Sequence, residues 1–515
     1  MKKLNTKIIL GIGAMLFMFS SCTDDLNTEP KVELSIENLL AQDPNAIEGL
    51  LSKMYGTFAL SGPTGPGSSD ISGPDPGETA FLRSIINLQD FTTDNMKNRW
   101  GDDGLDQLTT TSDWDPNNKF FRYLYDRVYY IVPQTTNIIK VLDGVEVNNE
   151  AQIVGELRFI RALAYYYMID CFGKGVLVTT ENYGETSALP EASRTELFDY
   201  VEQELLAIED IVPDNNGYGR ANKATVRMLL AKLYLNAEVY TGTARYSDAL
   251  SYTSKVIDEG GYTLATNFVS LFSGDNDTST EIIFPLIADP VVSQSFGNTT
   301  YIVNGSTSTE TMSIIDFGTT DAWTGHRATK AWYGLYGDLD TTTDDRGQLF
   351  WRDGHNYEMT DYKIWADGYP SIKFRNTNFN GPSTATSFSG TDFPMFRLAD
   401  AYLMYAECVL RGGGGSNTQA LDYVNEVRER AHATAITSAQ LNLDFILDER
   451  ARELNLEGHR RTDLIRFGKF TGGSYLWPWK GNALNGASIP ATYKLFPIPQ
   501  SALQANINLT QNPGY

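Results

Sequence analysis

The chain has 515 residues, of which 42% are hydrophobic and 12% aromatic, a composition that excludes a disordered or fibrous protein. Its 41 Lys and Arg residues against 64 Asp and Glu residues give a formal net charge of −23. Contacts to phosphates and anionic lipids need clustered basic side chains, so this charge argues against nucleic-acid binding and a charge-driven membrane role. Three cysteines are too few for a disulfide framework.

Residues 1–21 have the pattern of a signal peptide. Lys2, Lys3 and Lys7 form a positive region before an apolar run from Ile8 to Phe19. The run is short for a helix that spans a bilayer. We therefore expect residues 1–21 to be removed from the mature protein.

The end of this segment, Phe19-Ser20-Ser21-Cys22, resembles a bacterial lipobox, whose cysteine is diacylated and becomes the new N-terminus. Several acyl chains on one residue would anchor the protein stably. We predict a lipidated Cys22 and a tether over residues 22–33. Within the tether, Asp24-Asp25 resembles the surface-export signal of Bacteroidetes lipoproteins. An ordinary signal peptide followed by an incidental cysteine is the alternative.

Helical periodicity dominates the remainder of the chain. It predicts a helix over 36–60, interrupted near Asp43-Pro44. Further helices are expected over 120–142, 153–172 and 195–211, the last with Thr195 and Glu196 in its N-cap region. Residues 61–79 are rich in Gly, Pro and Ser and predict a long loop, a feature that is often functional in a compact protein.

Two later segments resemble tetratricopeptide-type helical hairpins. Residues 225–257 show apolar side chains at helical spacing with a break after Gly242, and 395–431 repeat the pattern around Gly412–Gly415. Between them, 262–394 is rich in small polar residues and predicts loops with short strands such as Glu281–Ile287. We therefore expect a mainly α fold with one loop-rich region.

Common catalytic and metal-binding motifs are absent from the sequence, including the zinc-protease, nucleophile-elbow, phosphate-loop and dinucleotide patterns. The four histidines are scattered without metal-ligand spacing. A pair of glycosidase carboxylates stays open, because it is defined by distance in space. Cys171 and Cys408 lie on apolar helical patterns and are expected as buried thiols, although a bridge between them stays open.

Four sequence motifs occur in order along the mature chain. They are GELRFIRALAYYY with CFG (155–173), FPMFRLADAY with AE (393–407), DERARE with EGHRRTDLIRF (448–467), and the C-terminal FPIP and NPGY (496–515). Behind a lipobox, these motifs resemble the SusD/RagB family of outer-membrane lipoproteins, and the resemblance covers 22–515. The arginines of these helices are expected to form ion pairs in an acidic protein rather than bind ligand. They are Arg158, Arg161, Arg460, Arg461 and Arg466.

The resemblance implies a single mainly α-helical body with tetratricopeptide-like hairpins and a loop-rich region with short strands that binds glycan. We divide this body into an N-terminal region over 34–260 and a C-terminal region over 261–515. The family's role would make the protein a binding protein with no required cofactor and no enzyme activity. It would be lipid-anchored in the outer membrane, face the cell exterior, capture oligosaccharide and pass it to a SusC-type TonB-dependent transporter.

Six residues match the glycan contacts of the starch-binding member of the family. The stacking residues would be Trp100, Phe296 and Trp323, and the hydroxyl-binding residues Asp75, Arg83 and Asp103. This assignment agrees with sugar chemistry, because aromatic rings cover the C–H faces while planar polar groups bind hydroxyls. Phe296 replaces a tyrosine, Asp103 replaces an asparagine, and Asn98 replaces a further tryptophan, so the grip on the glycan is altered.

A calcium site is also implied by the resemblance, although incompletely. Asp277 and Asp392 match acidic residues that hold Ca²⁺ in the starch-binding member, but Gly390 replaces another ligand. Calcium takes six to eight oxygen ligands, so the site would need further donors.

The preferred hypothesis from the sequence is a surface protein that binds α-glucan. The alternatives are a peptide-capturing, RagB-like lid of a transporter and, third, a glycoside hydrolase on a helical scaffold. Loop aromatics beside Asp and Arg residues favour the first of these three.

Overall fold

The computed structural model describes residues 35–101 and 103–515. Cys22, the signal peptide over 1–21 and the tether over 22–33 lie outside these residues, so the lipidation prediction is not addressed by the structure. Among the residues described, no helix combines the length and the hydropathy needed to cross a membrane.

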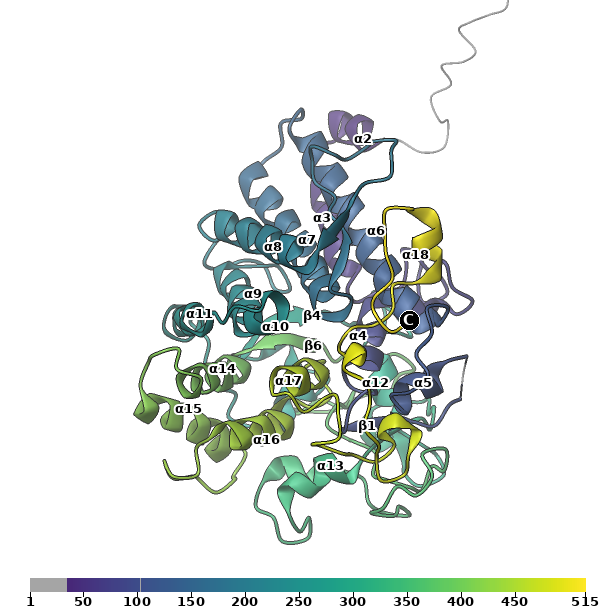
Figure 1. Ribbon diagram of the computed structural model, residues 1–515, viewed down its shortest axis with the longest axis vertical. Coiled ribbons are helices and arrows are strands. Elements are labelled where there is room, and N and C mark those ends of the chain that lie inside the picture. The colour runs from purple at the N-terminus through teal and green to yellow at the C-terminus, as the bar shows by residue number, and fades with distance from the viewer. Residues whose placement is uncertain (1–34, 102) are drawn as a thin grey trace, which may run out of the picture.

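The first half of the fold is almost entirely helical (Figure 1). Its helices are α2 (Ile36–Gln42), α3 (Ala46–Gly56), α4 (Phe81–Gln89), α5 (Leu105–Thr109), α6 (Lys119–Leu142), α7 (Glu150–Cys171), α8 (Arg194–Ile208), α9 (Lys223–Leu235), α10 (Ala237–Thr241) and α11 (Tyr246–Glu259). The predicted loop over 61–79 ends in the 3-10 turn η2 (Pro76–Thr79).

The second half begins with loops and short elements and ends in longer helices. Its helices are α12 (Thr299–Gly305), α13 (Lys330–Tyr333), α14 (Leu398–Leu410), α15 (Asn417–Arg430), α16 (Leu443–Leu454), α17 (Arg460–Arg466) and α18 (Gln500–Ala505). The strands form three antiparallel pairs: β1 (Met96–Asn98) with β5 (His326–Ala328), β2 (Lys174–Val176) with β3 (Glu191–Ser193), and β4 (Ile282–Leu286) with β6 (Phe393–Arg397).

The structure confirms the predicted mainly α fold and differs in detail. The chain breaks between α2 and α3 where Asp43-Pro44 predicted it, since α2 ends at Gln42 and α3 starts at Ala46. The expected N-cap region at Thr195 and Glu196 is the first turn of α8, but the cap itself is Ser193. Glu196 closes the capping box by accepting from the Ser193 N–H.

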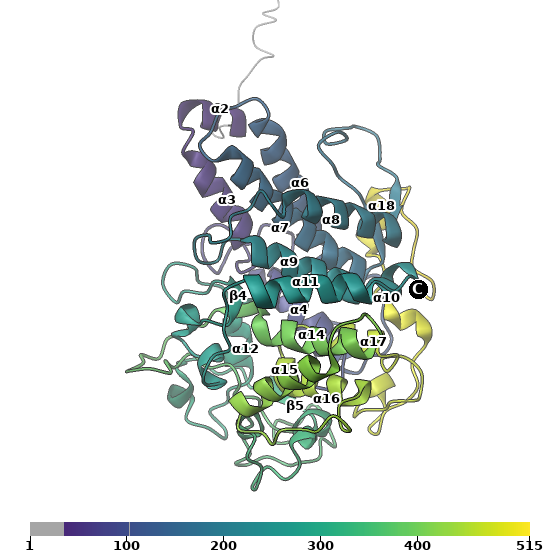
Figure 2. The same ribbon diagram turned by 90° about the vertical axis from the view of Figure 1, so that its left-hand side faces the viewer.

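The two predicted hairpins are α9 with α11 and α14 with α15, and they stack on one another. In Figures 1 and 2, α11 lies between α9 and α14, and α15 lies on the far side of α14. The short helix α10 follows α9 and ends at Gly242, whose φ of 79° gives the left-handed turn expected at a helix C-terminus.

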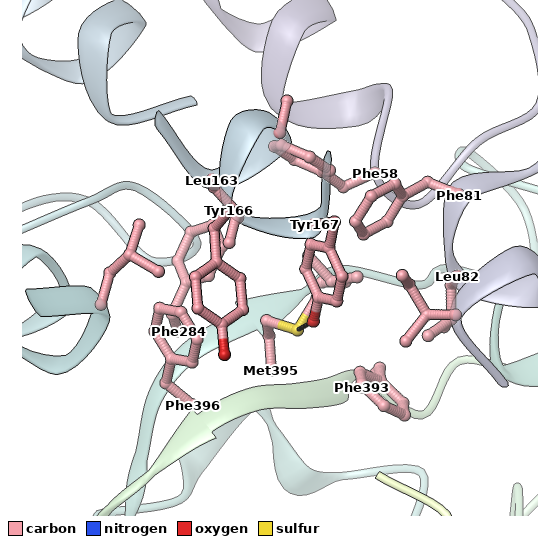
Figure 3. Packing of buried hydrophobic residues seen from close by; sticks show 14 of the residues in the cluster. Phe58, Phe81, Leu82, Leu163, Tyr166, Tyr167, Phe284, Phe393, Met395 and Phe396 are labelled. Atoms are coloured by element: carbon pink, nitrogen blue, oxygen red, sulfur yellow. Dashed lines mark hydrogen bonds between the residues drawn. The ribbon is translucent and has the colours of Figure 1, made fainter. Parts of the chain in front are cut away.

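A buried core joins the helical half to the loop-rich half around β4 and β6. Figure 3 shows Phe284 of β4 and Phe396 of β6 facing Tyr166 of α7, with ring centroids of the two phenylalanines 5.9 Å apart. Beside them, the Tyr167 hydroxyl donates to Met395 Sδ at 3.6 Å. Because β6 begins the FPMFRLADAY motif, that motif forms the centre of the molecule.

The arginines of the motif helices form ion pairs, as the sequence predicted. The pairs are Arg158 and Arg161 with Glu204, Arg460 with Asp94, Arg461 with Asp170, and Arg466 with Glu407. Most of these pairs are buried, since the charges leave water when the helices pack together. Removing one partner of such a pair costs about 3–5 kcal/mol, because the other charge stays buried and unpaired.

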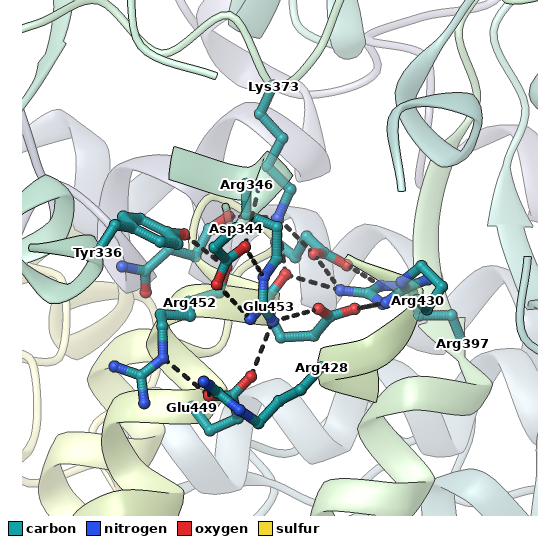
Figure 4. A network of polar contacts seen from close by, with 12 residues as sticks. Tyr336, Asp344, Arg346, Lys373, Arg397, Arg428, Arg430, Glu449, Arg452 and Glu453 are labelled. Atoms are coloured by element: carbon teal, nitrogen blue, oxygen red, sulfur yellow. Dashed lines mark hydrogen bonds and ion pairs between the residues drawn. The ribbon is translucent and has the colours of Figure 1, made fainter. Parts of the chain in front are cut away.

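A network of buried charges joins residues 344–346, β6, α15 and α16 in the C-terminal region (Figure 4). Arg397 Nη1 lies 2.6 Å from Glu453 Oε1, and Arg346 Nη1 lies 2.9 Å from Glu449 Oε1. Burial alone would raise the pKa of Glu453, but Arg430, Arg397 and Arg346 together hold it below its usual range.

Cys171 and Cys408 are free and buried, which confirms the expectation of packed thiols and excludes a bridge between them. Burial raises the pKa of both thiols well above its ordinary value. Both therefore remain neutral and unreactive at physiological pH.

Candidate functional site

The two-stranded ladder of β1 and β5 brings Trp100 and Trp323 together from positions 223 residues apart in the chain. Asn98 pairs with His326, and the Arg99 N–H donates to the Gly325 carbonyl at 3.0 Å. The Trp100 indole N–H then donates to the Trp323 carbonyl at 3.0 Å. As a result the two rings have centroids 6.4 Å apart and lie at 54° to each other.

A glycine permits this close approach. A Cβ atom at Gly325 would lie 2.4 Å from the Trp100 ring, so only glycine leaves room for the indole. Beneath Trp100, the buried His326 ring has its centroid 5.3 Å away, and Tyr301 packs against His326 at 4.6 Å. The tryptophan is therefore supported from below.

Helix α12 places Phe296 on the same surface. Phe296 lies just before the Asn298 cap of α12, and its ring centroid is 6.2 Å from that of Trp323. At the other end of α12, the Asn304 and Gly305 carbonyls accept from the N–H groups of Trp323 and Gly325 at 2.7 and 2.8 Å. One short helix thus holds Phe296 and the Trp323 loop in a fixed relation.

A fourth ring, Phe388, continues the series at 4.9 Å from Phe296. We call Trp100, Trp323, Phe296 and Phe388 the aromatic row; all four are partly exposed. Neighbouring rings are turned by 54°, 49° and 45°, so each ring is tilted against the next and the row is not flat. Phe388 was not predicted, although it carries the same signal as the others: an aromatic residue between small polar residues of a loop.

Four charged side chains form a continuous series that begins at Arg83 and ends at Asp103, and we call this series the charged row. They are Arg83, Glu78, Lys119 and Asp103, with successive N to O distances of 3.6, 2.9 and 3.7 Å. The structure therefore brings two predicted residues to the ends of one series. Glu78 and Lys119 were missed; the position of Glu78 in the predicted functional loop was the available signal.

Arg83 is buried and incompletely paired. Its guanidinium carbon lies 4.4 Å from the Tyr301 ring centroid, and its Nε has no hydrogen-bond partner within the described part of the chain. The Arg83 N–H donates to the Gly297 carbonyl at 3.0 Å, which attaches α4 to the turn that carries Phe296. A buried cation with a free donor is suited to a hydroxyl-rich ligand.

Asp75 lies on the same side but is not paired with Arg83. Its exposed side chain caps η2 by accepting from the Gly77 N–H at 2.9 Å. Gly77 lies against Phe296, since a Cβ there would be 2.6 Å from the Phe296 Cβ. Asp75 therefore projects from a turn that packs on the aromatic row.

Asn98, which replaces a tryptophan of the starch-binding member, is buried and performs a structural task. Its Oδ1 accepts from the Trp100 N–H at 2.6 Å and so fixes the backbone of that residue. It contributes no ring to the exposed surface.

Asp277 and Asp392, the predicted calcium ligands, line one hollow of about 560 Å³. Each Asp392 oxygen accepts one hydrogen bond, Oδ1 from the Ala288 N–H and Oδ2 from the Tyr218 hydroxyl. Burial, with Asp277 adding to it, raises the pKa of Asp392 to about 6. Over residues 35–101 and 103–515, no three His, Cys, Asp or Glu side chains are grouped to hold a metal. The calcium site therefore stays a prediction from resemblance alone.

Comparison with known proteins places this geometry in a family. The model of the SusD family matches residues 260–515. The chain is 34% identical to the starch-binding protein SusD of Bacteroides thetaiotaomicron, over 96% of each sequence. The chain belongs to the SusD family.

Solved structures of the family share the fold. A SusD superfamily protein from Parabacteroides distasonis matches with a TM-score of 0.72 and 21% identity, over 94% of this chain and 100% of that one. A laminarin-binding SusD-like protein matches with a TM-score of 0.68 and 20% identity, over 92% and 99% of the two chains. The predicted family and its helical body are thereby confirmed.

Proposed function

We propose that this protein captures oligosaccharide at the cell surface and delivers it to a SusC-type TonB-dependent transporter, with α-glucan as the preferred ligand. In this proposal it is a binding protein without enzyme activity, and it is held at the outer membrane by acyl chains on Cys22. The protein requires no cofactor for this role.

The aromatic row is the observation that carries the proposal. Its partly exposed rings come from four separate segments. A strand pair, a helix and several loops hold these rings side by side. Rings of this kind stack on the C–H faces of successive sugars. The charged row beside them supplies donors and acceptors for the hydroxyl groups.

The preference for α-glucan is supported by curvature and by similarity. Because neighbouring rings are turned by 45° to 54°, the row suits a chain that curves, as α-linked glucose does. The relative at 34% identity is named a starch-binding protein. The name of the laminarin-binding neighbour indicates that this fold also serves other linkages, so the test must include them.

Calorimetric titration of the soluble domain with maltoheptaose, laminari-oligosaccharide and xyloglucan oligosaccharide tests the proposal. We expect binding of maltoheptaose, which Trp323→Ala abolishes while the thermal melt stays close to wild type. Losing a central stacking residue commonly costs 2 kcal/mol or more, about thirtyfold in affinity. Unaltered maltoheptaose binding by Trp323→Ala would contradict the site.

The same titrations separate the alternatives. Binding of another glycan through Trp323, without binding of maltoheptaose, would correct only the preferred ligand. Binding of peptides and of no glycan would favour the RagB-like alternative. Release of reducing ends from the glycan, by an activity that copurifies with the protein, would favour a hydrolase.

A further inference from the structure

Trp479 is a partly exposed ring that the aromatic row does not include. Two residues earlier, Trp477 is only 1% exposed and belongs to the main hydrophobic core. In the described part of the chain, the clusters of buried apolar side chains contain Trp477 but not Trp479. Core packing therefore accounts for the first tryptophan, whereas the second lies outside the core and donates its indole N–H to the Met359 carbonyl at 3.2 Å.

The backbone at Trp479 is held in an unfavourable conformation. Its φ is 71°, in the left-handed region that a bulky side chain rarely adopts. Two backbone hydrogen bonds hold this turn. The Trp479 N–H donates to the Ala483 carbonyl at 3.0 Å, and the Asn482 N–H donates to the Thr110 carbonyl at 3.0 Å. The second bond fastens this turn to the end of α5, and Figure 1 shows the yellow C-terminal loops beside α5 and β1.

A short path leads from Trp479 to the aromatic row. The Trp479 ring lies 5.0 Å from the Tyr362 ring, and the next residue, Lys363, pairs with Asp106 at 3.1 Å. A Cβ at Gly101 would lie 3.4 Å from the Asp106 carboxylate and 3.7 Å from Lys363 Nζ. Because Gly101 directly follows Trp100, the Asp106 and Lys363 pair lies between the end of the row and Trp479.

The polar groups on this path match the chemistry of the charged row. The segment after Trp100 carries two acidic residues, and each is paired with a lysine: Asp103 with Lys119, and Asp106 with Lys363. The Lys363 and Asp106 side chains are 54% and 35% exposed, so solvent or a ligand can reach both. Trp479 is thus a partly exposed ring that packs on the residue preceding an exposed donor, Lys363, which is itself paired with Asp106.

We propose that the glycan-binding surface extends past Trp100 to an outer subsite made by Trp479, with Asp106 and Lys363 binding hydroxyls between the two rings. This inference rests on the proposed function. The outer subsite would be filled only by chains longer than the aromatic row can hold. The protein would thereby select longer oligosaccharides over short ones.

Trp479→Gly is the sharpest test, because glycine accepts the left-handed φ of this turn. It removes the ring together with its hydrogen bond to the Met359 carbonyl, so the thermal melt is measured alongside. Titrations would compare maltotriose with a maltooligosaccharide of about twelve glucose units. A longer chain can bind in more registers, and this statistical factor alone raises its apparent affinity. We expect wild type to prefer the longer chain by more than this factor. Trp479→Gly should weaken binding of the long chain about tenfold. Lys363→Met, at an exposed position, should lower the same preference by a smaller factor.

Tyr357→Ala is the matched control, since it removes a 44% exposed ring from the loop that also carries Tyr362. The Tyr357 ring packs on Tyr333 and Tyr369 rather than on Trp479. An unchanged preference for the long chain in both Trp479→Gly and Lys363→Met, with normal thermal melts, would overturn the outer subsite. In that case Trp323→Ala would still abolish binding, so the proposed function would stand. If wild type binds none of the glycans offered, both proposals are overturned.

Discussion

At the scale of single residues, the site depends on aromatic side chains whose role could be predicted from the sequence and on glycines whose role could not. Trp100, Trp323 and Phe296 could be selected because an aromatic residue in a polar loop has no obvious core to join. Gly325 gave no comparable signal. Its role follows only from the 2.4 Å that would separate a Cβ from the Trp100 ring.

Gly325→Ala should therefore weaken glycan binding without a ligand-contacting side chain being removed. The added methyl group must displace the Trp100 indole, which breaks its spacing to Trp323. We expect at least tenfold weaker maltoheptaose binding and a loss of about 1–3 kcal/mol in stability, as is typical of overpacking. Titration and chemical denaturation measure the two effects. Wild-type affinity in this variant would show that the Trp100 position is not critical.

His326 beneath the row makes stability depend on pH. Burial, with the charges of Arg83 and Arg327 adding to it, lowers the pKa of His326 well below the ordinary 6.5. Below pH 6.5 the unfolded chain binds a proton that the folded protein does not bind, so stability is lost as the pH falls. Neither ring nitrogen has a hydrogen-bond partner among the residues described, so no such bond there stabilises the protonated ring.

We expect His326 to contribute a loss of about 1.4 kcal/mol for each pH unit below 6.5. Denaturation at pH 7.5, 6.5 and 5.5 should show a smaller acid slope in His326→Leu than in wild type. His459, whose pKa is lowered to about 3 chiefly by burial, gives the same sign and is retained in both proteins. Identical slopes would mean that His326 is protonated in the folded state.

At the scale of elements, the C-terminal motif fixes the strand that carries Trp100. Asp94 lies two residues before β1, and its carboxylate pairs with Arg460 of α17 at 2.7 Å and accepts from the Tyr475 hydroxyl. Asp90, just upstream, accepts the Leu456 and Gly458 N–H groups at 3.1 Å each. The motif that indicates the family therefore supports the proposed glycan site through β1.

Asp94→Ala should destabilise the fold by about 3–5 kcal/mol, because Arg460 stays buried without its partner. Chemical denaturation measures this loss. The double variant Asp94→Ala with Arg460→Met should recover part of it, since the unpaired charge is gone. If the double variant is less stable than Asp94→Ala, the ion pair is not the cause.

The helices were predictable from the sequence for a physical reason that does not extend to the loops. Periodicity marked α6, α7 and both hairpins because each helix buries one face. Between 262 and 394 no period exists, and α12 with its seven residues gave no signal. The charged row was likewise hidden, because Glu78 and Lys119 are 41 residues apart and only the packing of η2 on α6 joins them.

At the scale of the whole molecule, charge and hydropathy limit how the protein can associate with a membrane. The formal net charge is −23, so anionic lipid heads repel the body. The residues that the structure describes include no helix able to cross a bilayer. The acyl anchor on Cys22 stays a prediction from the sequence, because Cys22 lies outside the residues that the structure describes.

Cys22→Ala should release the protein from the outer-membrane fraction, because several acyl chains are needed for stable anchoring and none would be attached. Fractionation with immunoblotting measures the release, and replacing Asp24 and Asp25 by Ala is the matched control. That control should stay in the membrane fraction but lose protease accessibility on whole cells. Wild-type protein extracted in mild detergent should copurify with a TonB-dependent transporter, and the released variant should not. Membrane retention of Cys22→Ala would mean that another part of the chain, or the transporter itself, holds the protein at the membrane.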